Sequence, residues 1–160
     1  MVSAPLPVPA ARSEGDSKAR LRLWIRLLRA SRLIEGVTRE RLKAQFGATL
    51  PRFDVLAALY RKPGGMLMSE ISRFLMVSNG NVTGIVDRLV ADGFVARSQR
   101  NGDRRTSFVS LTRKGRTAFG AMAAAHESWI DELLGRISVR DADQMSAKLT
   151  AFRSDWEGGA

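Results

Sequence analysis

A cluster of arginines is the first feature of the chain that points to binding chemistry. Residues 97–105 contain Arg97, Arg100, Arg104 and Arg105 but only one acid, Asp103, so four positive charges minus one leave +3. Guanidinium groups bind phosphates and are attracted to the negative potential of a narrow DNA minor groove. A solvated turn with incidental charge is the alternative interpretation. The whole chain has a net charge of +10, which also favours a polyanionic partner.

Two glycines interrupt an otherwise well-patterned helix in VSNGNVTGIVDRLVADGFV, residues 77–95. Each glycine inside a helix costs about 1 kcal/mol relative to alanine. The apolar stripe of this helix consists of Val82, Ile85, Val86, Leu89 and Val90. The opposite face consists of Gly80, Gly84, Asp87, Arg88 and Ala91, flanked by Asn81 and Thr83.

We interpret this glycine-containing face as a surface for close contact with a groove of nucleic acid. Small residues let the helix backbone approach the groove wall, and asparagine, threonine and arginine side chains reach base edges or phosphates. Such contact would offset the lost helix propensity. The alternative is that Gly80 and Gly84 are tolerated defects, or that they allow another helix to pack closely.

The residue types argue against catalysis and metal binding. The 160 residues include no cysteine and a single histidine, His126. A disulfide, a thiolate metal site and a thiol nucleophile are therefore excluded, and the spacing assembles no nucleophile–base or acid–base pair. We expect His126 to be packed or at an interface, because no second histidine or cysteine completes a metal site. We predict no enzyme, no cofactor and no metal.

Helical periodicity and turn signals predict six helices and one hairpin. Residues 1–16, rich in proline, alanine and serine, are expected to form a mobile tail. Candidate N-cap residues are Ser69, Ser78 and Thr112. The stretch SVRD at 138–141 has the form of a capping box, and Gly93 is placed to end a helix. The helices are predicted at 17–46, 51–60, 69–75, 79–92, 113 to beyond 130 and 138–157. The runs FVARSQR and TSFVSLT around NGDRR are typical of a β-hairpin.

This order of elements predicts a mainly α fold with a small β-hairpin wing, a winged helix-turn-helix. In that fold the second helix of the motif enters the major groove of DNA. The long first and last helices carry apolar stripes that a chain of this size can hardly cover, so we expect a second copy to cover them. Candidate contacts are Leu21, Trp24, Trp129, Met145, Leu149 and Trp156. The predicted domains are a tail at 1–16, a dimerisation helix at 17–48, a DNA-binding lobe at 49–112 and dimerisation helices at 113–157.

Three motifs in this frame resemble the MarR family of bacterial transcription regulators. They are VDRLVADG in the predicted helix 79–92, GDRR at the hairpin tip and LTRKG at the start of the next helix. The helical frame also resembles the family from about residue 17 to residue 157. Within the family, LMVSNGNVTGIVDRLV is similar to regulators of hydroxycinnamate and related aromatic-acid degradation.

The resemblance implies a homodimer that binds double-stranded DNA at a pseudo-palindromic operator, most often as a repressor. It also implies which residues contact DNA. The candidates are Ser69 and Arg73 near phosphates, Asn79, Asn81, Thr83 and Arg88 at the major groove with Ser78 beside them, and Arg100, Arg104 and Arg105 in the hairpin.

Members of this family usually respond to a small molecule, often aromatic and anionic, bound between the dimer helices and the DNA-binding lobe. Because the chain has no cysteine, the thiol-based peroxide-sensing branch is excluded, and release from DNA should depend on a ligand. Arg22, Arg26 and Arg29, at i, i+4 and i+7, are candidates to bind a carboxylate or phosphate beside Trp24 and Leu28. The expected effector is an aromatic acid or an aryl-CoA thioester. Alternatively, these arginines form a solvated basic face that assists attraction to DNA.

The competing function is a sequence-nonspecific or architectural winged-helix protein without an effector. Such a protein would show a steep dependence on salt without a preference for one DNA sequence. The chain has no apolar run of about 18 residues and no basic-then-apolar start, so we expect a cytoplasmic protein.

Overall fold

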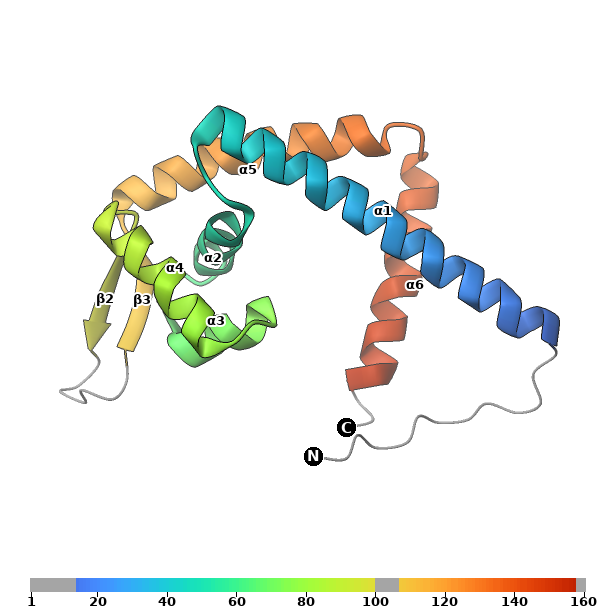
Figure 1. Ribbon diagram of the computed structural model, residues 1–160, viewed down its shortest axis with the longest axis horizontal. Coiled ribbons are helices and arrows are strands. Elements are labelled where there is room, and N and C mark those ends of the chain that lie inside the picture. Colours follow the sequence, from blue (N-terminus) through green and yellow to red (C-terminus); the bar gives the residue numbers. More distant parts are fainter. Residues whose placement is uncertain (1–13, 100–106, 158–160) are drawn as a thin grey trace. The chain divides into compact units, whose positions relative to one another are not determined.

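The computed structural model describes residues 14–99 and 107–157, which form six helices and a three-stranded antiparallel sheet (Figure 1). The elements are α1 (Glu14–Phe46), α2 (Leu50–Tyr60), β1 (Met66–Leu67), α3 (Met68–Leu75), α4 (Asn79–Ala91), β2 (Val95–Gln99), β3 (Ser107–Leu111), α5 (Arg113–Leu134) and α6 (Val139–Glu157). The predicted mainly α fold with a small β wing is confirmed. None of these helices combines the length and apolarity needed to cross a membrane.

The chain divides into two compact units. The first, Glu35–Ile130, contains the elements from α2 to β3 together with the last turns of α1 and most of α5, and we call it the lobe. Within the described residues, the second unit consists of residues 14–34 and 131–157. The functional boundaries after residues 48 and 112 remain predictions.

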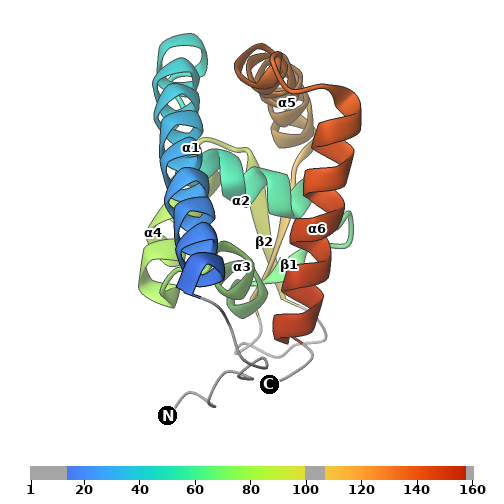
Figure 2. The same cartoon turned by 90° about the vertical axis from the view of Figure 1, so that its right-hand side faces the viewer.

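The lobe is built around one apolar core. Helices α2, α3 and α4 contact one another, and α2 also contacts β3. Figure 2 shows α2 and α3 in front of the strands in a second view. Because burying one large aliphatic side chain contributes about 1.5–3 kcal/mol, the shared core holds α4 firmly in place. The core includes Leu42, Leu56, Leu59, Met66, Ile71, Val82, Val86, Leu89, Val95, Val109, Phe119 and Met122.

The sheet has the order β1–β3–β2, and both outer strands run antiparallel to β3. Strands β2 and β3 form the predicted hairpin, paired from Val95 opposite Leu111 to Gln99 opposite Ser107. Strand β1 was not predicted, because its two residues are too few to show an alternating pattern. Residues 100–106, the predicted hairpin tip, lie outside the described residues.

Two predicted helix starts are wrong. Helix α1 begins at Glu14 rather than at residue 17, because Glu14 pairs with Lys18 at 2.5 Å and acidic residues favour the positive end of a helix. The predicted tail is therefore shorter by three residues, and residues 1–13 lie outside the described residues. Helix α3 begins at Met68, so Ser69 is inside its first turn and is not its N-cap. The carboxylate of Glu70 accepts a hydrogen bond from the backbone N–H of Leu67 at 2.8 Å instead.

Other predicted helix ends are confirmed by their hydrogen bonds. The Ser138 hydroxyl accepts the Asp141 backbone N–H (3.2 Å), as the capping-box pattern predicts. The hydroxyl also donates to the Asp141 carboxylate (Oγ–Oδ2 2.7 Å), where a full capping box would have the Ser138 backbone N–H donate. Gly93 follows α4 with a left-handed φ of 74°. Both signals act within one helical turn, which is why the sequence reveals them.

Helix α4, the hairpin and α5 meet at one tight junction. Thr112, directly before α5, accepts the Gly115 N–H (Oγ1–N 3.0 Å), and its hydroxyl donates to the Gly93 carbonyl (2.7 Å). The backbone of Gly115 lies so close to Phe94 that a Cβ would stand 1.8 Å from the Phe94 carbonyl oxygen. The LTRKG motif therefore joins the end of α4 to the start of α5.

His126 and Trp129 pack inside the lobe. The His126 ring lies 5.0 Å from the Phe53 ring and 6.5 Å from the Trp129 ring, centroid to centroid, and burial lowers its pKa below the ordinary 6.5. Trp129 is buried in the lobe, and its ring contacts the Phe46 ring. The prediction that Trp129 lies at a dimer contact is therefore wrong, because its ring packs within the chain. The described residues contain no cluster of three side chains suited to hold a metal ion.

Gly115→Ala is expected to destabilise the fold by about 3 kcal/mol, because the new methyl group must displace the Phe94 backbone. Chemical denaturation followed by circular dichroism measures this loss. Gly120→Ala in the same helix is the matched control, since its Cβ would meet no heavy atom within 4 Å. It should raise stability by up to about 1 kcal/mol. Equal stability of the two variants would contradict the junction described above.

A half-buried acid in α2 opposes folding at neutral pH. Burial, and then the charge of Glu35, raise the pKa of Asp54 above its ordinary 3.8. The native state therefore binds a proton more readily than the unfolded chain, so ionisation of Asp54 destabilises the fold as pH rises through this shifted pKa. Asp54→Asn should raise the melting temperature at pH 7, and the gain should vanish as pH falls towards 3.8. A lower melting temperature at pH 7 would instead indicate a cationic partner for Asp54.

Candidate nucleic-acid interface

The turn between α3 and α4 fixes where α4 begins. Met76 has a left-handed backbone, φ 53°, which is rare for a residue with a side chain, and it is 92% exposed. The N–H groups of Met76 and Val77 donate to the carbonyls of Arg73 (3.3 Å) and Ser72 (3.2 Å). The Ser72 hydroxyl also donates to the Val77 carbonyl at 2.7 Å. Hydrogen bonds thus close a turn that presents an apolar side chain to solvent.

Helix α4 buries one face and exposes the other. Val82, Val86 and Leu89 are fully buried, as the apolar stripe predicts, although Val90 is more exposed than predicted. On the opposite face Gly80 and Gly84 are exposed, and a Cβ at either position would meet no heavy atom within 4 Å. Within the described residues neither glycine serves close helix packing. An outward strip of helix backbone is therefore left without bulky side chains.

An ion pair connects this outward face to the wing. Arg97 on β2 lies 2.7 Å from the Asp87 carboxylate on α4, Nη2 to Oδ1. Both side chains are partly exposed, so the pair contributes at most about 1 kcal/mol. The pair links β2 to α4. Arg97, counted in the sequence as part of the basic cluster, is therefore neutralised locally.

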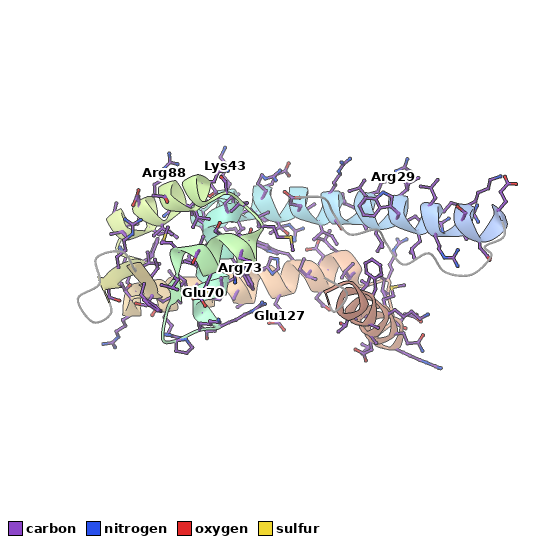
Figure 3. All side chains as sticks on the ribbon, turned by 90° about the horizontal axis from the view of Figure 1, so that it is seen from below. Arg29, Lys43, Glu70, Arg73, Arg88 and Glu127 are labelled. Atoms are coloured by element: carbon purple, nitrogen blue, oxygen red, sulfur yellow. The ribbon has the colours of Figure 1, made fainter. Side chains whose placement is uncertain are left out.

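Most of the predicted DNA-binding residues that the structure describes lie on the surface of the lobe. Figure 3 shows Arg88 extending outward from α4 and labels Arg73 on α3. Ser78 occupies the N-cap position of α4, as predicted, but its side chain makes no capping hydrogen bond. The exposed residues are Ser69, Arg73, Ser78, Asn81, Thr83 and Arg88. The side chain of Asn79 and the whole of Arg100, Arg104 and Arg105 lie outside the described part of the chain.

The predicted effector residues lie on α1 in the second unit. Arg22, Arg26 and Arg29 are exposed on one face and form no ion pair with any described residue; Figure 3 labels Arg29. Trp24 is 58% exposed, and Leu28 is half-buried. Because successive helical residues turn by about 100°, Trp24 and Leu28 point about 160° away from Arg26. On one copy of α1 the three arginines therefore share one face, and Trp24 and Leu28 lie on the opposite face.

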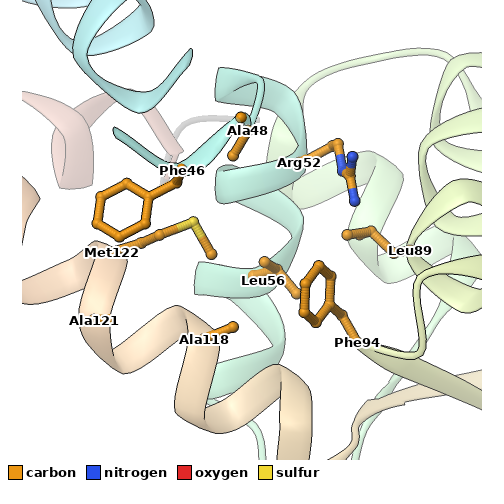
Figure 4. A pocket seen from close by; sticks show the side chains of 10 residues that line it. Phe46, Ala48, Arg52, Leu56, Leu89, Phe94, Ala118, Ala121 and Met122 are labelled. Carbon is orange, nitrogen blue, oxygen red and sulfur yellow. The ribbon is translucent and has the colours of Figure 1, made fainter. Parts of the chain in front are cut away.

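A half-open pocket of about 160 Å³ lies in the lobe (Figure 4). Its one charged lining residue is Arg52, which forms a hydrogen-bonded ion pair with Asp92, the C-cap residue of α4. This site is not predictable from the sequence, because Arg52 and Asp92 are 40 residues apart and no local pattern links them. The lining residues are Phe46, Gly47, Ala48, Arg52, Leu56, Leu89, Phe94, Ala118, Ala121 and Met122.

Comparison with known proteins shows that the chain is similar to transcriptional regulators. A sequence model of the MarR family matches residues 48–107, which include α2 to β2. The chain is 32% identical over 137 residues to the transcriptional activatory protein BadR of Rhodopseudomonas palustris, and the alignment covers 82% of this chain and 78% of BadR.

Solved structures agree with this match. A MarR family transcriptional regulator from Silicibacter pomeroyi superposes with a TM-score of 0.75 at 33% identity, covering 91% of this chain and 99% of that one. The Staphylococcus aureus MepR–DNA complex superposes with a TM-score of 0.69 at 22% identity, covering 83% of this chain and 96% of MepR. At that identity the second likeness shows the shared fold alone.

Proposed function

The chain belongs to the MarR family of transcriptional regulators, and from this premise we propose that it binds a pseudo-palindromic DNA operator as a homodimer and is released by a small aromatic effector. It is a regulator rather than an enzyme, like the proteins it resembles. We propose repression as its mode of action. BadR is named as an activator. A reporter assay with the operator that the purified protein selects from genomic DNA, called the selected operator below, has to decide between repression and activation.

The observation that carries the DNA-binding proposal is the outward face of α4. Gly80 and Gly84 leave backbone exposed where a helix ordinarily gains stability from a side chain. A helix lying in a major groove benefits from such closeness, because its short polar side chains then reach base edges. Asn81 and Arg88 flank this strip and are exposed. Ser69 and Arg73 on α3 are proposed to contact phosphates.

Exposed apolar side chains in the second unit support the homodimer. Leu33 is 64% exposed on α1, and Phe152 is 63% exposed on α6. Large apolar side chains in such numbers usually mark a contact with another protein surface. A second copy of the chain is the proposed partner, because closed twofold dimers are the commonest oligomers and match a palindromic site. Other exposed members of this set are Leu21, Leu23, Trp24, Val139, Met145 and Leu149.

The effector is proposed to be an aromatic acid or its CoA thioester. The three α1 arginines, Arg22, Arg26 and Arg29, suit the clustered phosphates of a thioester, since guanidinium groups bind phosphate oxygens in pairs. Trp24 and Leu28 would have to come from the α1 of the partner subunit, because they point away from these arginines. A basic face that attracts DNA remains the alternative role of this row.

Gly84→Ala should stabilise the protein and weaken its binding to DNA. The substitution is expected to add up to about 1 kcal/mol to the free energy of unfolding through helix propensity. It should lower affinity for the selected operator about tenfold, or ~1.4 kcal/mol, because the new methyl group separates α4 from the base pairs. Denaturation and fluorescence anisotropy measure the two effects on one preparation.

The control is Gly120→Ala, which should gain similar stability without losing affinity. If both variants bind the operator like the native protein, the glycine strip does not contact DNA.

The same titrations test the architectural alternative. A regulator should prefer the selected sequence over a scrambled duplex by at least about a thousandfold at physiological salt. Equal affinities with a steep salt dependence would support the alternative instead.

A further inference from the structure

The turn before α4 exposes apolar side chains. Among the described residues Met76 is the most exposed large apolar side chain, at 92%, and Phe74 and Val77 beside it are 48% and 39% exposed. Single exposed apolar residues are common, but neighbouring ones form a patch, which we call the apolar turn. Met76 lies two residues before Ser78, the N-cap of α4. The apolar turn therefore stands at the start of the helix that is proposed to enter the major groove.

The backbone of Met76 has a conformation that methionine disfavours. Its φ of 53° and ψ of 36° are left-handed, and no other non-glycine residue of the described chain has a positive φ. This conformation is unfavourable for a residue with a Cβ, whereas glycine adopts it freely. A backbone conformation of this kind at an exposed position suggests a function. We therefore expect the methionine side chain to contribute something other than stability.

Hydrogen bonds hold the apolar turn rigid. The N–H of Met76 donates to the carbonyls of Ser72 and Arg73, and the Ser72 hydroxyl donates to the Val77 carbonyl at 2.7 Å. Ile71, one residue before Ser72, is fully buried and anchors α3 in the core. A surface that is already ordered loses little conformational entropy when it binds a partner.

The chemistry of the major groove limits what an apolar side chain can contact there. In a helix-turn-helix the first residues of the second helix reach the base edges. The thymine methyl is the one apolar group that the base pairs present in this groove. A flexible, polarisable methionine adapts well to such a group. The exposed guanidinium of Arg73, three residues before Met76, favours DNA over an uncharged protein surface as the partner.

We propose that Met76 contacts the methyl group of one thymine in each half-site of the operator and so helps to determine which sequence is bound. The inference rests on the proposed function, because it needs α4 to lie in the major groove. It adds a specificity contact that lies before α4 and involves no hydrogen bond. Removing the thymine methyl group and removing the methionine side chain then abolish the same contact.

Replacing thymine by deoxyuridine in the selected operator tests this contact, because the change removes one methyl group and keeps every hydrogen-bonding group. Each thymine is replaced in turn, at equivalent positions of both half-sites, and fluorescence anisotropy measures the affinity of the full-length protein. At the contacted position native protein should lose about fourfold in affinity for each half-site, the factor expected when one methyl group is returned to water.

Met76→Gly is the decisive variant, because glycine suits the left-handed turn and should keep or raise the melting temperature. The variant should bind the thymine operator at least as weakly as native protein binds the uracil operator. It should lose no further affinity when uracil is placed at the contacted position, since the two changes remove one shared contact. Met76→Leu keeps an apolar side chain and is the matched control, which should still prefer thymine. If Met76→Gly does not fold, Met76→Asn replaces it.

Three results would overturn the proposal. Equal losses on uracil substitution in native protein and in Met76→Gly would show that another side chain contacts the methyl groups. A loss of affinity in Met76→Gly that is the same for thymine and uracil operators would indicate a contact with the DNA backbone. Unchanged affinity of Met76→Gly for the selected operator would leave the apolar turn to a protein partner. Failure of the proposed function is distinguishable, because native protein would then show no preference for the selected operator over a scrambled duplex.

Peroxide footprinting tests the same contact without a substitution. Hydrogen peroxide converts accessible methionines to sulfoxides, which mass spectrometry locates. The selected operator should slow the oxidation of Met76 severalfold, and a scrambled duplex at the same concentration should slow it less. Met145 on α6, which is 53% exposed, is the internal control and should oxidise at the same rate with and without DNA. An unchanged rate for Met76 in the presence of the operator would contradict the contact.

Discussion

The orientation of α4 depends on a backbone contact that only glycine permits. Gly115 at the start of α5 meets the Phe94 carbonyl, and the Thr112 hydroxyl bonds to the Gly93 carbonyl beside it. Lys114 donates to the next carbonyl back, that of Asp92. The end of α4, the entry to the hairpin and the start of α5 therefore share one junction. A rigid recognition surface needs such an anchor, because base contacts require side chains held in fixed positions.

Two features that ordinarily disfavour a helix lie on the exposed face of α4 or in the turn before it. Met76 holds a left-handed backbone in the turn before α4, and Gly80 and Gly84 leave one face of α4 bare. Neither feature contributes to the core, which is filled by the opposite face of α4. Local conflicts of this kind are characteristic of functional surfaces, because stability is lost there in exchange for contact with a partner. The core of the lobe supplies the stability that the surface lacks.

Local signals in the sequence predicted most of the fold. The Ser138 capping box, the left-handed Gly93 and the apolar stripe of α4 each act within a few residues, so their pattern survives in the sequence. Contacts between residues far apart in the sequence leave no such pattern. Nothing in the sequence pairs Arg52 with Asp92, and a two-residue strand such as β1 has no period to detect.

The candidate site was predicted in part. The exposed face of α4 follows from helical periodicity, and the glycines stand out because a packed helix would avoid them. The prediction of effector residues on α1 rests on residue type, and the turn of the helix separates Trp24 from the arginines. Trp129 was assigned to a dimer contact because apolar stripes look alike whether they pack within a chain or between chains, yet it is buried in the lobe.

Base-methylation interference on the selected operator tests most directly whether the glycine strip of α4 lies in the major groove. Dimethyl sulfate marks guanine N7 in the major groove and adenine N3 in the minor groove. Bound DNA should be depleted of N7-methylated guanines in two blocks about 10 base pairs apart, one for each α4 of a dimer. Interference confined to adenine N3, or none at all, would contradict the account.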